Sequence, residues 1–206
     1  MTIVVFPSEM ILKMSPLATP KFSIVNFQLS IGSHRLLDKR KMVHFRKEES
    51  TVTIRFATRE DIPEMIKLLK QVGGVHHDIR PDLFRGDAQK YDAPALEALL
   101  EDKNRPILIA GDTQVMGYAF CILRNVENDS VLCDRRELYL DDLCVEKACR
   151  GQGIATALYQ EVLALARKLH CQTVTLNVWC GNDSAMAFYE KMGMKPQKIG
   201  MEVSVC

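Results

Sequence analysis

The sequence lacks a long apolar run and a strong charge of either sign. No apolar stretch approaches the roughly 18 residues needed to span a bilayer, and the first residues lack the basic-then-apolar order of a secretory signal. Formal net charge is +1 over 206 residues, so no overall field would hold the chain on nucleic acid or on an anionic membrane. We therefore expect a cytoplasmic protein without a nucleic-acid or membrane partner, in which any anion site is local.

Paired cysteine ligands are missing as well. The chain has seven cysteines, an odd number, and none of them stand as C-x-x-C. His76 and His77 alone do not supply the paired ligand spacing of a zinc site. We expect reduced, mostly packed thiols and no metal.

Residues 1–50 differ in pattern from the rest of the chain. Short apolar pieces are interrupted by Pro7, Pro16 and Pro20, and neither the strand period of 2 nor the helix period of 3.6 is sustained there. The short basic cluster at 39–41 is of the kind that is usually solvated. We expect a poorly ordered N-terminal extension over 1–50 and one globular domain over 51–206.

From Val52 onward, apolar residues recur at strand and helix spacing. Val52, Ile54 and Phe56 alternate with polar residues, as in a half-buried strand. Thr58 with Asp61 three residues later matches the capping box that opens a helix.

The predicted elements are, in order, strand 52–56, helix 58–72 ending at Gly73 and Gly74, a long connection 75–91, helix 93–100, strands 106–110, 115–123 and 137–145, helix 154–169, strand 173–179, helix 182–192 and a closing strand 198–205. This order, β-α-α-β-β-β-α-β-α-β, indicates an α/β fold with a mixed sheet and helices on its faces, rather than a doubly wound parallel sheet.

A glycine-rich turn joins a predicted strand to a predicted helix. After the strand that ends at Val145, the chain reads Arg150-Gly151-Gln152-Gly153-Ile154-Ala155. The first N–H groups of a helix have no partner within it, and glycines let these groups approach an anion closely. The turn therefore fits a pyrophosphate, although G-x-G at a helix start also serves tight packing. No G-x-x-x-x-G-K-[ST] is present, and the third glycine and strand-end acid of the dinucleotide fingerprint are missing, so neither an NTP nor NAD is favoured.

The neighbouring strands and the last helix carry more specific patterns. They read Leu140-Asp141-Asp142-Leu143-Cys144-Val145, then Leu176-Asn177-Val178-Trp179, Asn182-Asp183-Ser184-Ala185 and Phe188-Tyr189-Glu190-Lys191-Met192-Gly193-Met194. Together with the glycine turn, they resemble motifs A and B of the GNAT family of N-acetyltransferases, whose motif A has the consensus Arg/Gln-x-x-Gly-x-Gly/Ala. The resemblance runs from about Val52 to the C-terminus and implies a GNAT-like fold with acetyl-CoA as cosubstrate.

The resemblance also assigns residues to the cofactor. It implies that the pyrophosphate lies on backbone N–H groups of the glycine turn, and that the pantetheine arm pairs with the strand that ends at Val145 where two strands splay apart. Asn182 would fix the far wall of that slot. The cofactor-binding residues expected on this basis are Leu143, Cys144, Val145, Arg150, Gly151, Gln152, Gly153, Ile154, Ala155, Thr156 and Asn182.

An amine acceptor must lose a proton before it attacks a thioester. With a reference pKa near 10.4, only about one alkylamine in a thousand is neutral at neutral pH. Asp141 and Asp142 lie beside the expected thioester, and two like charges this close should raise one pKa toward a useful range. Regular alternation places Asp141 on the face of Leu143 and Val145 and Asp142 on the other face, and a bulge would swap them. We favour Asp141 as the base, although both acids would also suit binding of a substrate or a neighbouring cation.

The leaving thiolate needs a proton, and the oxyanion needs a donor. Tyr189 matches the usual general acid of the family, and a phenol with a pKa of about 10 can protonate a thiolate. The same tyrosine also fits a core position on an apolar helix stripe. A backbone N–H near Leu143 or Cys144 is the candidate oxyanion donor. A covalent route through Cys144 is an alternative, and His76 and His77 offer another proton path.

The acceptor is the least determined part of the hypothesis. In GNAT members that acetylate ribosomal proteins, the strand carries a catalytic glutamate where this chain has Asn177, so that mechanism is not expected. We expect an N-acetyltransferase acting on a primary amine of a small molecule. The alternatives are a protein or peptide amine, or a non-catalytic acyl-CoA-binding regulatory module. A homodimer is compatible with the sequence, but nothing in it specifies an oligomeric state.

Overall fold

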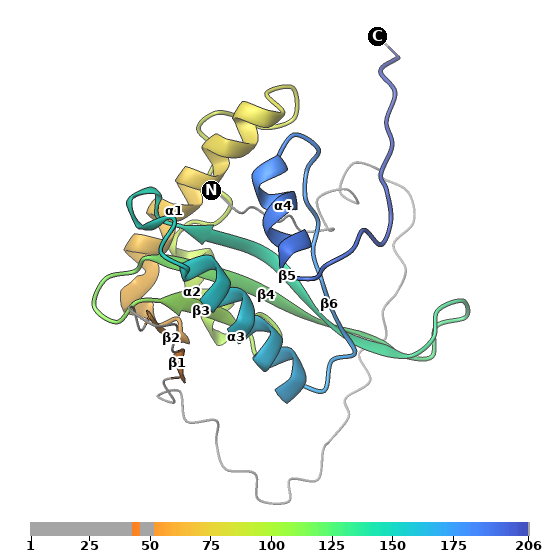
Figure 1. The fold of residues 1–206 in the computed structure, drawn as a ribbon, viewed down its shortest axis with the longest axis horizontal. Coiled ribbons are helices and arrows are strands. Elements are labelled where there is room, and N and C mark those ends of the chain that lie inside the picture. The colour runs from red at the N-terminus through yellow and green to blue at the C-terminus, as the bar shows by residue number, and fades with distance from the viewer. Residues whose placement is uncertain (1–42, 46–51, 206) are drawn as a thin grey trace, which may run out of the picture.

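The computed structural model describes residues 43–45 and 52–205, which form a mixed sheet with helices on both faces (Figure 1). Six strands follow one another across the sheet in chain order, and all neighbours are antiparallel except the parallel last pair. The strands are β1 (Val43–Phe45), β2 (Val52–Phe56), β3 (Ile107–Ala110), β4 (Gly117–Val126), β5 (Arg135–Val145) and β6 (Thr173–Thr175), and the helices are α1 (Ile62–Ile79), α2 (Ala93–Glu101), α3 (Ile154–Lys168) and α4 (Asp183–Lys191). The predicted α/β class with a mixed sheet is confirmed.

Strand β1 lies inside the segment 1–50, which we expected to be an extension, and it pairs antiparallel with β2. Residues 1–42 and 46–51 lie outside the described part of the chain. The expected disorder of the extension therefore remains a prediction.

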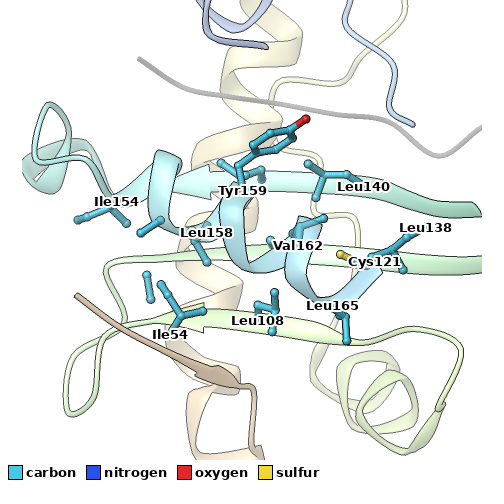
Figure 2. Packing of buried hydrophobic residues seen from close by; sticks show 14 of the residues in the cluster. Ile54, Leu108, Cys121, Leu138, Leu140, Ile154, Leu158, Tyr159, Val162 and Leu165 are labelled. Carbon is cyan, nitrogen blue, oxygen red and sulfur yellow. The ribbon is translucent and has the colours of Figure 1, made fainter. Parts of the chain in front are cut away.

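Helix α3 covers one face of the sheet. Its apolar stripe, including Leu158, Val162 and Leu165, packs onto Leu108 and Leu140 of the strands beneath it (Figure 2). Ala185, Phe188 and Tyr189 of α4 belong to the same cluster. The period-3.6 spacing of the apolar residues thus predicted the buried face correctly.

Helices α1 and α2 cover the other face. Met65 and Leu69 of α1 and Leu96 of α2 pack with Ile109 and Phe120 of the sheet. The predicted capping box is confirmed, since the backbone N–H of Thr58 donates to Asp61 Oδ2 at 2.8 Å and a one-turn 3₁₀ helix leads into α1. Because helices cover both faces of the sheet, the central strands are apolar at nearly every position.

Helix α1 does not stop at the glycines where we predicted its end. It continues through Gly73 and Gly74 to Ile79. A Cβ on Gly73 would lie 2.5 Å from the backbone carbonyl oxygen of Ala88, whereas one on Gly74 would meet nothing within 4 Å. Gly73 therefore serves a close approach of the 80–92 loop to the helix, and the connection that we predicted over 75–91 begins only after Ile79.

The end of the chain also differs from the prediction. The strand predicted over 173–179 is confirmed only for β6, and the closing strand predicted over 198–205 does not form. A strand needs a partner, and the three residues of β6 offer few ladder hydrogen bonds. Glu202 is tied instead to Arg80 by an ion pair of 2.7 Å. The alternating apolar residues of the tail, Ile199, Met201, Val203 and Val205, are exposed.

Candidate active site

A β-bulge in β5 places the two aspartates. The register pairs Phe120 with Asp142 and Cys121 with Leu140, so that Asp141 is an extra residue with no partner on β4. An extra residue on one strand interrupts the alternation of side chains, so that Leu140 and Leu143, three residues apart, can face the same side of the sheet. Regular alternation, which would place Asp141 on the face of Leu143, is therefore interrupted here, and the bulge that we named as the alternative is present.

Lys90 occupies the space in front of Asp141. Its Nζ lies 2.8 Å from Asp141 Oδ2, and the side chains are 23% and 2% exposed, respectively. Burial lowers the pKa of Lys90, but the charges of Asp141 and Asp142 outweigh it and the net direction is upward. Asp141 Oδ1 has no hydrogen-bond partner among the described residues. The site thus holds an alkylammonium group against a buried carboxylate.

Asp142 is buried as deeply as Asp141. Only 1% exposed, it accepts a hydrogen bond at Oδ2 from the hydroxyl of Tyr118, at 3.0 Å. Burial raises the pKa of the Asp142 carboxyl to about 7, with the charge of Asp141 adding to the rise and that of Lys90 opposing it. A carboxyl with this pKa is able both to accept and to release a proton near neutral pH.

The 80–92 loop that carries Lys90 is anchored at several points. The Phe84 ring lies 5.2 Å from the His76 ring and 5.6 Å from the Trp179 ring, measured between centroids. Nδ1 of His77 is 2.7 Å from the backbone oxygen of Phe84, and Ala88 rests against Gly73. These contacts join the loop to α1 and to the segment that follows β6.

The glycine turn has the backbone conformation that an anion site requires. Gly151 and Gly153 have φ values of +79° and +81°, and a Cβ at either position would meet nothing within 4 Å. Gly153 is the N-cap of α3, so the N–H groups of Ile154 to Thr156 begin the helix without intrahelical partners. Open space and unpaired N–H groups at a helix start fit a pyrophosphate.

The edge of β5 beside this turn has no strand partner along its last residues. Pairing with β6 covers only 137–139 of β5, and no strand of the described residues pairs with that edge from Leu140 to Val145. The backbone oxygen of Val145 accepts hydrogen bonds from Gln71 Nε2 at 3.1 Å and Arg150 Nε at 3.3 Å. Such an edge can pair with a ligand that carries amide groups.

Two asparagines near the site already have partners. The side chain of Asn182 accepts a hydrogen bond from the backbone N–H of Ala185 at 3.2 Å and caps α4. Asn177 Nδ2 donates to the hydroxyl of Tyr139 at 3.1 Å. An amide is not a base whatever its partners, so the expectation for Asn177 stays a prediction.

Tyr189 is fully enclosed between α4 and its neighbours. It is 2% exposed, and its ring lies 5.9 Å from Tyr159 and 5.1 Å from Phe188. Its hydroxyl has no hydrogen-bond partner among the described residues. Burial, followed by the charge of Asp142, raises the pKa of Tyr189 well above its usual 10. The Tyr189 hydroxyl is therefore buried close enough to Asp142 to feel its charge, and its O–H group donates no hydrogen bond to a described residue.

The alternative routes through Cys144 and His76 find little support. The Cys144 thiol is fully buried in the α1-side core, and burial raises its pKa rather than lowering it. The lowered pKa expected for a covalent route is therefore wrong. Burial, together with the charge of Lys90, lowers the pKa of His76 to about 3, so it would remain neutral at neutral pH.

Sequence reasoning missed three residues of the site. Lys90, Gln71 and Tyr118 reach the aspartates or the end of β5 from other elements. Only Tyr118 carried a signal, because a tyrosine in a buried strand usually needs a partner for its hydroxyl. Within 43–45 and 52–205, no cluster of His, Cys, Asp and Glu could hold a metal, and no helix combines the length and apolarity needed to cross a membrane.

Comparisons with known proteins agree on one family. The model of the acetyltransferase (GNAT) family matches residues 74–194. Peptidyl-lysine N-acetyltransferase YjaB of Salmonella typhimurium is 27% identical over 146 residues, covering 70% of this chain and 83% of that protein. N-alpha-acetyltransferase 30 of Schizosaccharomyces pombe is 40% identical over 55 residues, which are 27% of this chain and only 37% of the yeast protein.

A solved structure shows the same architecture. A mutant form of the BH1408 protein from Bacillus halodurans superposes with a TM-score of 0.71 at 28% identity, covering 74% of this chain and 99% of that one.

Proposed function

This chain belongs to the GNAT family of acetyltransferases, and from that premise we propose that it transfers the acetyl group of acetyl-CoA to a primary amine at the end of an alkyl chain. The observation that carries the proposal is the Lys90 ammonium 2.8 Å from Asp141, with the buried carboxyl of Asp142, whose pKa is about 7, as the next residue along the strand. An amine acceptor needs both a binding carboxylate and a base that functions near neutral pH.

Donor binding is proposed at the glycine turn and the open edge of β5. The N–H groups of Ile154 to Thr156 and the positive-φ glycines would hold the pyrophosphate, and backbone groups of Leu143 to Val145 would pair with the pantetheine arm. Asn182 would fix the far wall of the slot, because its amide oxygen caps α4 and its amide nitrogen is a donor that a ligand could use. Acetyl-CoA would supply the activated acyl group.

We assign the base role to Asp142 and the amine-orienting role to Asp141. Asp141 already binds an ammonium group. Asp142 lies next to it, with one oxygen held by Tyr118 and the other without a partner among the described residues. This reverses our slight preference for Asp141, because the pKa of Asp142 is the one that reaches about 7.

Tyr189 is assigned the general-acid role. Its raised pKa would make it a poor acid toward a thiolate in water. Burial in the same site also disfavours the CoA thiolate, and therefore raises the pKa of the CoA thiol. Proton transfer depends on the difference between the pKa of Tyr189 and that of the thiol more than on either value alone. The unused hydroxyl donor of Tyr189 supports the assignment.

The acceptor that we propose is a small molecule with a primary alkylamine. The contact between the Lys90 ammonium and Asp141 supports a primary amine on an alkyl chain as the acceptor. A lysine side chain of a peptide is the second candidate, because a lysine occupies that position in this chain and because one relative is a peptidyl-lysine N-acetyltransferase. A non-catalytic acyl-CoA-binding module would not need a buried base.

The test is a CoA-release assay with polyamines, aminoglycosides, amino acids and lysine peptides, ranked by kcat/KM. For the best acceptor, kcat/KM should rise about tenfold per pH unit below about pH 7 and level off above it, following the pKa of Asp142. Asp142→Asn should lower kcat by about 10² to 10⁴ and leave acetyl-CoA affinity unchanged. No CoA release with any amine, despite tight acetyl-CoA binding, would favour the binding module instead.

A further inference from the structure

One amine of the protein itself lies against the pair of aspartates. The Nζ atom of Lys90 sits 2.8 Å from Asp141 Oδ2, and the lysine is only 23% exposed. Its charge acts on Asp142 as well, since it opposes the rise in the pKa of that carboxyl. Lys90 therefore occupies the position that an acceptor amine needs in order to be bound by one carboxylate and deprotonated by the other.

The loop around Lys90 fixes this position from both sides. Phe84 packs between His76 and Trp179, and Ala88 lies against Gly73 of α1. The Tyr91 ring lies 5.3 Å from Nζ and contributes a cation–π contact. Holding a nucleophile in place beside a base raises its effective concentration by orders of magnitude. A surface lysine such as Lys103, which is exposed, has no such arrangement.

We propose that Lys90 is an internal acceptor, acetylated by its own active site when no external amine is present. This inference rests on the proposed acetyl transfer. The ammonium first gives one proton to Asp142, which releases it to solvent. The Nζ lone pair then forms the C–N bond to the thioester carbon as the C–S bond breaks, and the second proton passes to the departing thiolate. The products are Nε-acetyllysine and CoA thiol.

Acetylation of Lys90 would change the site that produced it. The amide carries no charge, so Asp141 would lose its counterion and Asp142 would lose the charge that now opposes the rise of its pKa. Two buried carboxyls without a cation favour protonation of one of them. The modified enzyme should therefore need a higher pH to acetylate external amines.

The experiment incubates the full-length chain with acetyl-CoA and no acceptor, and follows acetylation of individual lysines by peptide mass spectrometry. Lys90 should be acetylated at least about tenfold faster than Lys103, and its rate constant should not change when the protein is diluted. Lys90→Arg keeps the positive charge without a nucleophilic amine and should lose this acetylation. Lys103→Arg is the matched control and should keep it. Asp142→Asn should slow acetylation of Lys90 by about 10² or more, with the slow background at Lys103 unchanged.

Three results would overturn the inference. Equal acetylation of Lys90 and Lys103 would mean uncatalysed reaction at exposed amines. A rate proportional to protein concentration would mean transfer between molecules. An unmodified Lys90 in an enzyme that releases CoA with external amines would reject the inference alone, whereas an absence of both reactions would also reject the proposed function.

Discussion

Replacing Asp142 by asparagine should stabilise the protein while it removes the proposed base. An aspartate in the unfolded chain has a pKa of about 3.9, and burial raises that of Asp142 to about 7. The folded chain thus holds this proton more tightly than the unfolded chain, so the free energy of unfolding falls as pH rises from about 4 to about 7 and stays low above that range. A difference of about three pKa units corresponds to about 4 kcal/mol.

Asp142→Asn removes this cost while keeping the size of the side chain and an oxygen for the Tyr118 hydroxyl. The stability gained should therefore be largest in alkaline solution, up to about 4 kcal/mol, and should vanish below about pH 4. Between about pH 5 and about pH 8, the difference between variant and parent should grow by roughly 3 kcal/mol.

Urea denaturation of parent and variant at those two pH values measures the difference directly. Asp87→Asn is a suitable control, because Asp87 is exposed on the loop and loss of its charge should have a small effect at both pH values. A stability difference between Asp142→Asn and the parent that does not change with pH would refute the reasoning. So would a difference that shrinks as pH rises.

Three further predictions concern the glycines and Tyr189. Gly73→Ala should destabilise the fold by about 1–3 kcal/mol, because the new Cβ meets the Ala88 carbonyl, whereas Gly74→Ala should stabilise it by up to about 1 kcal/mol; urea denaturation distinguishes them, and equal effects would contradict the close approach. Gly153→Val should weaken CoA binding about tenfold, or about 1.4 kcal/mol, in calorimetric titration; unchanged affinity in a folded variant would make the turn a packing feature. Tyr189→Phe should lower kcat by about 10² to 10⁴ with acetyl-CoA affinity intact, and a loss below about threefold would exclude the acid role.

Local patterns in the sequence were enough to predict most elements. Alternation at Val52, Ile54 and Phe56 and the capping box at Thr58 and Asp61 depend on neighbouring residues only, and the structure has both. The predicted end of α1 was wrong because Gly73 allows the close approach of Ala88 rather than ending the helix. That approach is a tertiary contact, which the local sequence does not contain. The prediction of a closing strand was wrong for a similar reason. Alternation indicates which side chains would share a face of a strand, but it does not indicate a strand with which to pair.

The same limit applies to the candidate site. The two aspartates and the glycine turn could be chosen from their residue types and spacing. Lys90 could not, because it stands 51 positions before Asp141 and a lysine is usually expected in solvent rather than against a buried carboxylate. The choice between Asp141 and Asp142 depended on the burial of Asp142 and on the charges around it, which come from residues far away in the sequence and which no side-chain pattern of β5 specifies.

Because Asp141 is the extra residue of the bulge in β5, a one-residue deletion could remove its carboxylate without changing the fold. Removing Asp141 would make the pairing with β4 continuous, because Phe120 and Cys121 already face Asp142 and Leu140. Leu140 and Leu143 would then stand two positions apart and keep the same face. A chain with that one-residue deletion should keep both hydrophobic cores and lose the carboxylate that holds Lys90. Insertion or deletion of this one residue would thus add or remove the carboxylate while the rest of the sheet stays unchanged.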